Sequence, residues 1–108
     1  MAISYTDRVK RERSDYDLAM RASVKLEDVL GEDAPIVTGE WDRSEDEQGQ
    51  PLIALRLTDL VGQSVLGEIS PNELQSPTKT AIYLHRLWGD LLHMQNVSRL
   101  QALIGAGD

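Results

Sequence analysis

Alternation of aliphatic and other side chains between positions 52 and 58 constrains the fold of this chain most strongly. The aliphatic residues are Ile53, Leu55 and Leu57. A period of two residues is typical of a strand with one buried face, so a half-buried strand is predicted over residues 52–59. Turn residues bound two further strand candidates, over residues 35–42 and 63–69. The short connections favour a three-stranded antiparallel meander.

Helical patterns flank these strands on both sides. In residues 15–30, six apolar side chains recur at helical spacing and fall within an arc of about 120°. They are Leu18, Ala19, Ala22, Leu26, Val29 and Leu30. A second helix is predicted from Pro77 to about Ile104, after a single helical turn that Ser70-Pro71 would start. The order α-β-β-β-α predicts an α+β fold with both helices packed on one face of the meander.

The length of the chain, 108 residues, suits one hydrophobic core. The apolar stripe of the first helix does not continue before Leu18. We therefore expect residues 14–108 to form a single α+β domain. Residues 1–13 are expected to form either a mobile N-terminal arm or a helical extension.

Composition and charge exclude several classes of site. The sequence contains no cysteine, which excludes disulfide scaffolds, thiol chemistry and thiolate-bound metals. The net charge is −7, and residues 32–50 hold one basic and seven acidic side chains. Residues 42–50 are predicted to be a solvated hairpin loop, with a docking patch for a basic partner as the alternative. A calcium loop does not fit, because its bidentate glutamate position falls on Ile53.

The sequence shows no targeting signal and no residue pattern typical of a catalytic site. No apolar run approaches the roughly 20 residues that span a bilayer, and no signal segment is visible, so a cytoplasmic protein without membrane contact is expected. His85 and His93 are eight residues apart on one helix, whereas a shared metal ion requires a spacing of three or four. No G-x-S-x-G turn or phosphate-binding glycine pattern occurs. No catalytic, cofactor-binding or metal-binding residues are predicted.

The apolar stripe of the last helix changes direction, and this feature carries the functional prediction. From Ala81 to Met94 the apolar side chains share an arc of about 140°. Beyond it, Gln95, Ser98 and Arg99 occupy that line, and the apolar side chains lie roughly half a turn away. The displaced residues are Val97, Leu100, Leu103 and Ile104. Either the helix bends near Gln95, or its last turns present these side chains to another surface.

A second apolar seam is expected near the N-terminus. Its residues are Tyr5, Val9, Tyr16 and Met20. Exposed contiguous apolar patches often mark binding sites, so both seams are interpreted as partner-binding surfaces. The alternatives are self-association, a different protein partner, and a fold-back of the last turns onto the first helix that would bury both seams within one monomer.

The sequence therefore predicts a non-catalytic protein–protein interaction module that forms a homodimer through its terminal helices. Adaptor, small regulatory subunit and neutralising inhibitor are the roles that fit. A first alternative is a small-ligand-binding or catalytic domain that uses the open sheet face near Glu40, Arg56 and Glu68. A second is an antitoxin-like nucleic-acid binder whose basic N-terminal arm contains Arg8, Lys10, Arg11 and Arg13. The acidic loop weighs against nucleic acid because it would repel phosphates.

Overall fold

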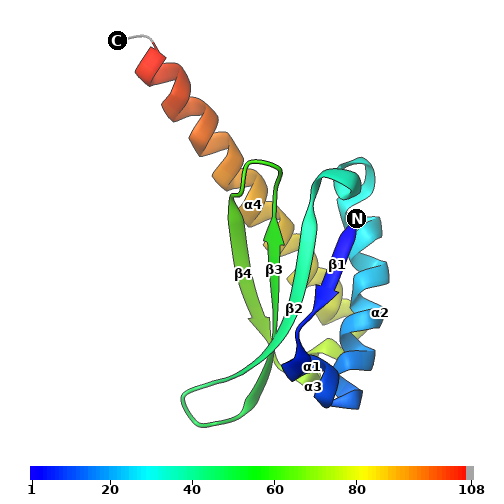
Figure 1. Ribbon diagram of the computed structural model, residues 1–108. Helices are drawn as coiled ribbons and strands as arrows, with labels where there is room; N and C mark the ends of the chain where they lie inside the picture. Colours follow the sequence, from blue (N-terminus) through cyan, green and yellow to red (C-terminus); the bar gives the residue numbers. More distant parts are fainter. Residues whose placement is uncertain (107–108) are drawn as a thin grey trace.

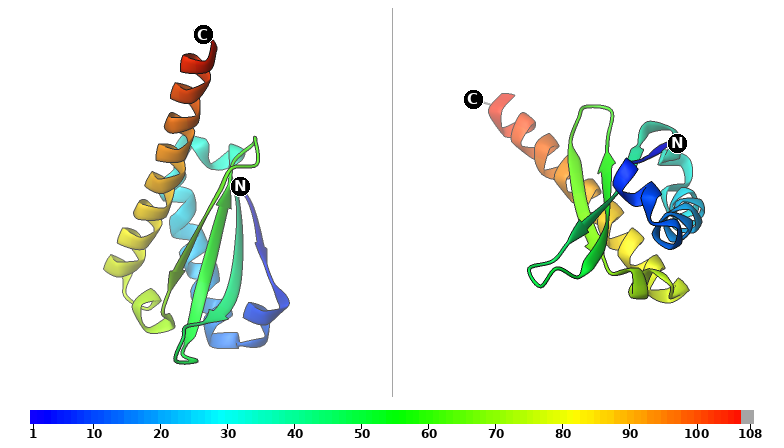
Figure 2. Two further views of the ribbon diagram at one scale, coloured as in Figure 1. Left: turned by 90° about the vertical axis from the view of Figure 1, so that its left-hand side faces the viewer. Right: turned by 60° about the horizontal axis from the view of Figure 1, so that its bottom comes forward.

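The computed structural model describes residues 1–106. In chain order its elements are β1 (Ala2–Tyr5), α1 (Asp7–Arg11), α2 (Arg13–Leu30), the 3₁₀ helix η1 (Gly31–Ile36), β2 (Thr38–Glu45), β3 (Pro51–Thr58), β4 (Ser64–Ile69), α3 (Pro71–Leu74) and α4 (Pro77–Ala106). The two long helices, α2 and α4, cover the same face of one sheet, and the other face is open (Figures 1 and 2). The fold is therefore α+β, as predicted.

The sheet has four strands in the order β1-β2-β3-β4. The antiparallel pairing of β2, β3 and β4 agrees with the prediction. The prediction missed β1, which pairs parallel with β2 so that Ala2 lies opposite Thr38 and Tyr5 lies opposite Trp41. The three-stranded meander is corrected to a four-stranded mixed sheet. A parallel partner is reached through a long crossover connection, here α1, α2 and η1, and so leaves no local signal in the sequence.

The first predicted strand is displaced along the chain. Pro35 belongs to η1, and β2 covers Thr38–Glu45 instead of residues 35–42. Proline has no backbone N–H to give to a strand ladder, which explains the later start. The first part of the predicted loop is also strand, because Glu45 still pairs with Pro51. The hairpin loop is therefore confined to the turn at residues 46–50.

The core lies between the sheet and the two long helices. The predicted alternation in β3 is confirmed, since Ile53, Leu55 and Leu57 are fully buried. Trp41 on β2 is also fully buried, and its indole N–H donates a 2.8 Å hydrogen bond to Oγ of Ser23 on α2. That bond satisfies the one polar atom of a large buried ring. Among the described residues no buried side-chain nitrogen or oxygen lacks a hydrogen-bond partner.

The N-terminal segment is a strand and a short helix, β1 and α1, where a helical extension or an arm had been expected. Val9 of α1 is 0% exposed, so the prediction that it lies on an exposed seam is wrong. The rings of Tyr5 and Tyr16 pack edge to face with centroids 5.1 Å apart. The Tyr5 hydroxyl lies 3.1 Å from Oγ of Ser23. Most of the expected N-terminal seam therefore holds β1 and α1 against α2.

The long helix α4 extends well beyond the sheet (Figure 1). Its 30 residues span about 45 Å at the helical rise, whereas an eight-residue strand spans about 27 Å. The radius of gyration is 15.2 Å, against about 13 Å for a compact domain of this size, because of this extension. α4 is one continuous helix, and its last turns do not fold back onto α2 (Figure 2). None of the helices in residues 1–106 is long and apolar enough to cross a membrane.

Candidate functional site

The end of α4 carries an exposed apolar surface. Between positions 92 and 104, every residue is exposed apart from Gln95 and Ser98, which are half-buried. The apolar side chains predicted to form an interface are Val97, Leu100, Leu103 and Ile104, called here the C-terminal stripe. Their exposed fractions are 38%, 59%, 71% and 69%, in that order. They lie roughly half a turn from the buried line of Leu84 and Leu91, so the stripe faces away from the sheet.

The opposite side of this helical segment is polar because it meets a hairpin turn. The side-chain amide of Gln95 donates a 3.0 Å hydrogen bond to Oδ2 of Asp59. Three residues later, Ser98 accepts a hydrogen bond from the side-chain amide of Gln63. These two contacts hold α4 to the turn between β3 and β4. The change in direction of the apolar stripe therefore has a structural cause. The side of α4 that packs on the sheet earlier in the helix meets the polar β3–β4 turn at residues 95–98.

The carboxylate of Asp59 organises this turn. Its Oδ1 accepts hydrogen bonds from the backbone amides of Val61 at 3.0 Å and Gln63 at 2.9 Å. The hydrogen bond from Gln95, followed by those from the turn amides, holds the pKa of Asp59 below its ordinary value of 3.8, although desolvation opposes the shift. The charged form of Asp59 thus favours both the turn and its contact with α4.

The same turn occurs twice in the chain, and one copy has apolar residues at its tip. Both turns read Asp-x-x-Gly-Gln, at residues 46–50 and 59–63. Each aspartate accepts two backbone amides, and Gly49 and Gly62 have positive φ angles of 77° and 87°. The central residues are Glu-Gln in the first turn. In the second they are Leu60 and Val61, which are 77% and 81% exposed.

This second tip was not predicted as a functional surface, although the repeated Asp-x-x-Gly-Gln pattern in the sequence would have allowed the comparison. Leu60 and Val61 border an open cleft of about 270 Å³ together with Ile36 and Arg99. The turn geometry requires only the aspartate and the glycine, as the first turn shows. The apolar tip is therefore an exposed surface that the fold itself does not need.

The N-terminal seam does not join the C-terminal stripe. Tyr5 and Tyr16 are half-buried against each other, and Val9 is in the core. Of the four predicted residues only Met20 is classed as exposed. α1 lies at the end of the sheet opposite to the free end of α4 (Figure 1). Of the two predicted partner-binding surfaces, the C-terminal stripe is therefore the one whose side chains are all exposed to a partner.

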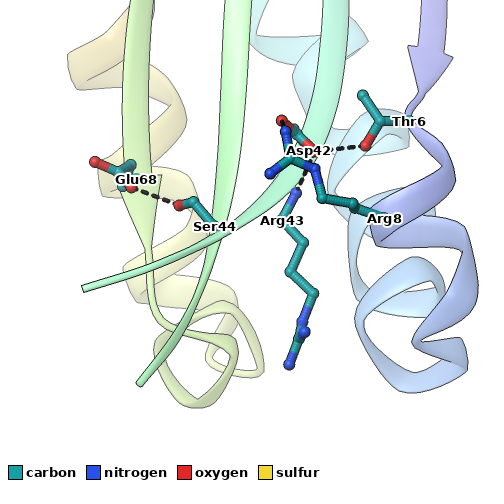
Figure 3. Close-up of polar contacts among 6 residues, drawn as sticks. All are labelled: Thr6, Arg8, Asp42, Arg43, Ser44 and Glu68. Carbon is teal, nitrogen blue, oxygen red and sulfur yellow. Dashed lines mark hydrogen bonds and ion pairs between the residues drawn. The ribbon is translucent and has the colours of Figure 1, made fainter. Parts of the chain in front are cut away.

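The open sheet face carries Glu40, Arg56 and Glu68, the residues of the first alternative site, but the three do not line one pocket. Glu40 and Arg56 are paired across β2 and β3, and both line a depression of about 340 Å³. Arg56 donates a 3.2 Å hydrogen bond to Ser64. Glu68 instead accepts a 2.6 Å hydrogen bond from Ser44 (Figure 3). In residues 1–106 no three histidine or carboxylate side chains are grouped to hold a metal ion.

One basic residue of the predicted arm, Arg8, and one basic residue of β2, Arg43, are paired with carboxylates. Arg8 forms a 3.3 Å ion pair with Asp42, whose Oδ1 also accepts a 2.6 Å hydrogen bond from Thr6 (Figure 3). Arg43 forms a 3.1 Å pair with the buried carboxylate of Asp15. A cavity of about 480 Å³ is lined by Arg8, Arg11, Glu12, Arg43, Ser44 and Glu45. The segment predicted as a basic arm is thus built into a mixed-charge surface of the folded body.

No family model, curated protein or solved structure matches this chain. The candidate surface rests on the geometry of α4 and the β3–β4 turn.

Proposed function

We propose that this protein is a non-catalytic protein–protein interaction module that self-associates through the C-terminal stripe of α4. The observation that carries the proposal is the exposure of Leu100, Leu103 and Ile104 on the face of α4 that points away from the protein's own sheet. Exposed apolar patches that are contiguous on a folded surface commonly mark contact sites. The polar side of the same segment is already engaged with Asp59 and Gln63, so the apolar side is the one left for a partner.

The size of the stripe supports a pair of chains. Its four side chains leave roughly 400 Å² of apolar surface exposed per protomer, which is in the range of the largest patch on a typical monomer. Two copies would bury about 800 Å² of apolar area. Because about 65% of a homodimer interface is apolar, this corresponds to about 1,200 Å² in total, the lower end for stable interfaces. We expect a dissociation constant on the order of micromolar.

The conformation of this segment supports the same proposal. Isolated helices shorter than about 12–15 residues are marginal in water, and helices in proteins gain most of their stability from packing of an apolar face. Residues 94–106 of α4, called here the α4 overhang, contact the body through Gln95 and Ser98. Burial of the stripe in a second chain would supply the missing packing.

The biological roles consistent with this proposal are an adaptor, a small regulatory subunit or a neutralising inhibitor. Each acts by presenting a surface and needs no reaction chemistry. The proposal keeps the cytoplasmic location expected from the sequence. The open sheet face is less favoured as a site, since Glu68 is hydrogen-bonded to Ser44 and does not line the depression near Glu40 and Arg56.

The test is native mass spectrometry over a concentration series. The double variant Leu100→Glu/Ile104→Glu should be monomeric where the parent protein is dimeric, because four charges would be buried in the dimer. Circular dichroism and urea unfolding should show an intact fold, since both side chains are exposed in the monomer. The matched control is Ile82→Glu, which changes another exposed aliphatic residue of α4 outside the stripe and should leave the dimer unchanged. A double variant that fails to fold, from a parent that is monomeric, would contradict the proposal.

A further inference from the structure

Three residues of the C-terminal stripe, Val97, Leu100 and Leu103, are spaced symmetrically about Leu100, whereas the counterpart of Ile104 is the polar Asn96. Val97 and Leu103 lie three residues on either side of Leu100, and Asn96 and Ile104 lie four residues on either side. Two antiparallel helices related by a two-fold axis through Leu100 bring residue i opposite residue 200 − i. A symmetric spacing is what such a pairing requires, because a two-fold interface uses the same patch on both subunits.

We infer that the partner is a second copy of this chain, with the two α4 overhangs packed antiparallel and Leu100 on the two-fold axis. This inference rests on the proposed function and adds the orientation and register of the contact. Val97 of one copy faces Leu103 of the other, and Asn96 faces Ile104. All four stripe residues of each copy are then covered by the other copy.

The charges on α4 favour this orientation over a parallel one. Arg86 and Asp90 are exposed and precede the overhang. A parallel pair would align Arg86 with Arg86 and Asp90 with Asp90 of the second copy, and like charges placed opposite each other oppose association. In the antiparallel pair, Arg86 and Asp90 lie outside the paired overhangs. They therefore face no residue of the described part of the second copy. The overhang itself carries one charged side chain, Arg99, which lies beside the stripe.

The shape of the molecule is compatible with this arrangement. The overhang spans about 20 Å at the helical rise. The antiparallel register pairs residue 94 with residue 106, so the two helices overlap over the full length of the overhang and no further. The two bodies then lie at opposite ends of the paired helices. The stripe faces away from the sheet of its own chain, so the second helix approaches from the exposed side of α4.

Cysteine cross-linking of the full chain tests the register, because the native sequence has no cysteine. A disulfide requires Cα atoms within about 7 Å. Leu100→Cys lies on the axis and should give a disulfide-linked dimer under mild oxidation. Ile104→Cys should not link to itself, because two copies of residue 104 are offset by eight residues, or about 12 Å along the helices. A mixture of Val97→Cys and Leu103→Cys chains should form the mixed dimer.

A matched control separates this contact from random collision. Val24→Cys places the thiol at an exposed site on α2 and should remain unlinked. Leu100→Cys and Ile104→Cys that link to a similar extent would overturn the antiparallel register while leaving self-association intact. A parent chain that is monomeric by mass, with no variant linked above the Val24→Cys level, would overturn both the register and the proposed function.

Discussion

The side-chain amide of Gln95 donates a 3.0 Å hydrogen bond to the carboxylate of Asp59, so the turn between β3 and β4 is tied to α4 where the helix leaves the sheet. Asp59 also organises its own turn through two backbone amides. One carboxylate thus links a local turn to the direction of the longest helix. The position of the C-terminal stripe depends on this link.

Protonation of Asp59 should weaken the turn and its contact with α4. The pKa of Asp59 is lower in the folded chain than its ordinary value of 3.8, first because of the Gln95 hydrogen bond. Its contribution to stability is therefore complete above about pH 4 and is lost as the pH falls through the folded pKa. Asp59→Asn should be less stable than the parent at pH 7, and the difference between the two free energies of unfolding should shrink as the pH falls below 3.8. Urea denaturation at pH 7, 4 and 2 measures both.

The other Asp-x-x-Gly-Gln turn provides the control for this experiment. Asp46 accepts the same two kinds of backbone amide, so Asp46→Asn reports the cost of the substitution in an equivalent turn. A difference between parent and Asp59→Asn that stays constant from pH 7 to pH 2 would contradict the role given to the charged carboxylate.

Gly67 on β4 lies where side chains of α4 approach the sheet closely. A Cβ atom there would lie 3.0 Å from Leu87 Cδ1 and 3.0 Å from the Tyr83 ring. The Tyr83 hydroxyl also donates a 2.6 Å hydrogen bond to the Gly67 carbonyl, which limits movement of that ring. We expect Gly67→Ala to lower the free energy of unfolding by about 1–3 kcal/mol through overpacking.

Gly89 is the matched glycine for this measurement. It lies on the exposed side of α4, and a Cβ atom there meets nothing within 4 Å. Gly89→Ala should therefore stabilise the helix by about 0.5–1 kcal/mol. Urea denaturation should give a lower free energy of unfolding for Gly67→Ala and a higher one for Gly89→Ala than for the parent. A neutral effect of Gly67→Ala would show that the helix can move away from the sheet at little cost.

The apolar tip at Leu60 and Val61 should be dispensable for folding. The double variant Leu60→Glu/Val61→Gln converts the second turn into the sequence of the first, and both side chains are exposed. The free energy of unfolding should change by less than about 0.5 kcal/mol. Dimer formation should also be unchanged, because the tip borders the side of α4 that carries Gln95 and Ser98, and no stripe residue lines the cleft beside the tip. A monomeric variant would mean that the interface includes the tip.

Local patterns in the sequence were sufficient for part of the fold. The alternation around Leu55 placed the central strand and its buried face, because a half-buried strand repeats every two residues. Ser70 was predicted as an N-cap, and its Oγ accepts the Glu73 amide at 3.1 Å. Gly31, a residue type that commonly ends helices, follows α2 as its C-cap with a φ of 57°. Each of these signals is contained in a few neighbouring residues.

Contacts between distant segments explain what was missed. The strand β1 pairs with β2, which lies far along the chain. The core that buries Val9 also includes residues of β2 and β3. The pattern of the last helix predicted that Val97 and Leu100 leave the core line. It did not reveal that Gln95 would meet Asp59, a residue in another element. The stripe could therefore be found from the sequence, but the polar contact that explains it required the structure.

Sedimentation equilibrium of the unmodified protein from low to high micromolar concentration is the direct test of whether two chains associate through α4. We predict that the average mass rises from that of one chain, 12.0 kDa, to twice that value and then stops. A limit of two chains is expected because a two-fold contact between the C-terminal stripes is closed. A mass of 12.0 kDa at every concentration would contradict self-association through α4. A mass that keeps rising beyond two chains would contradict the closed pairing about Leu100.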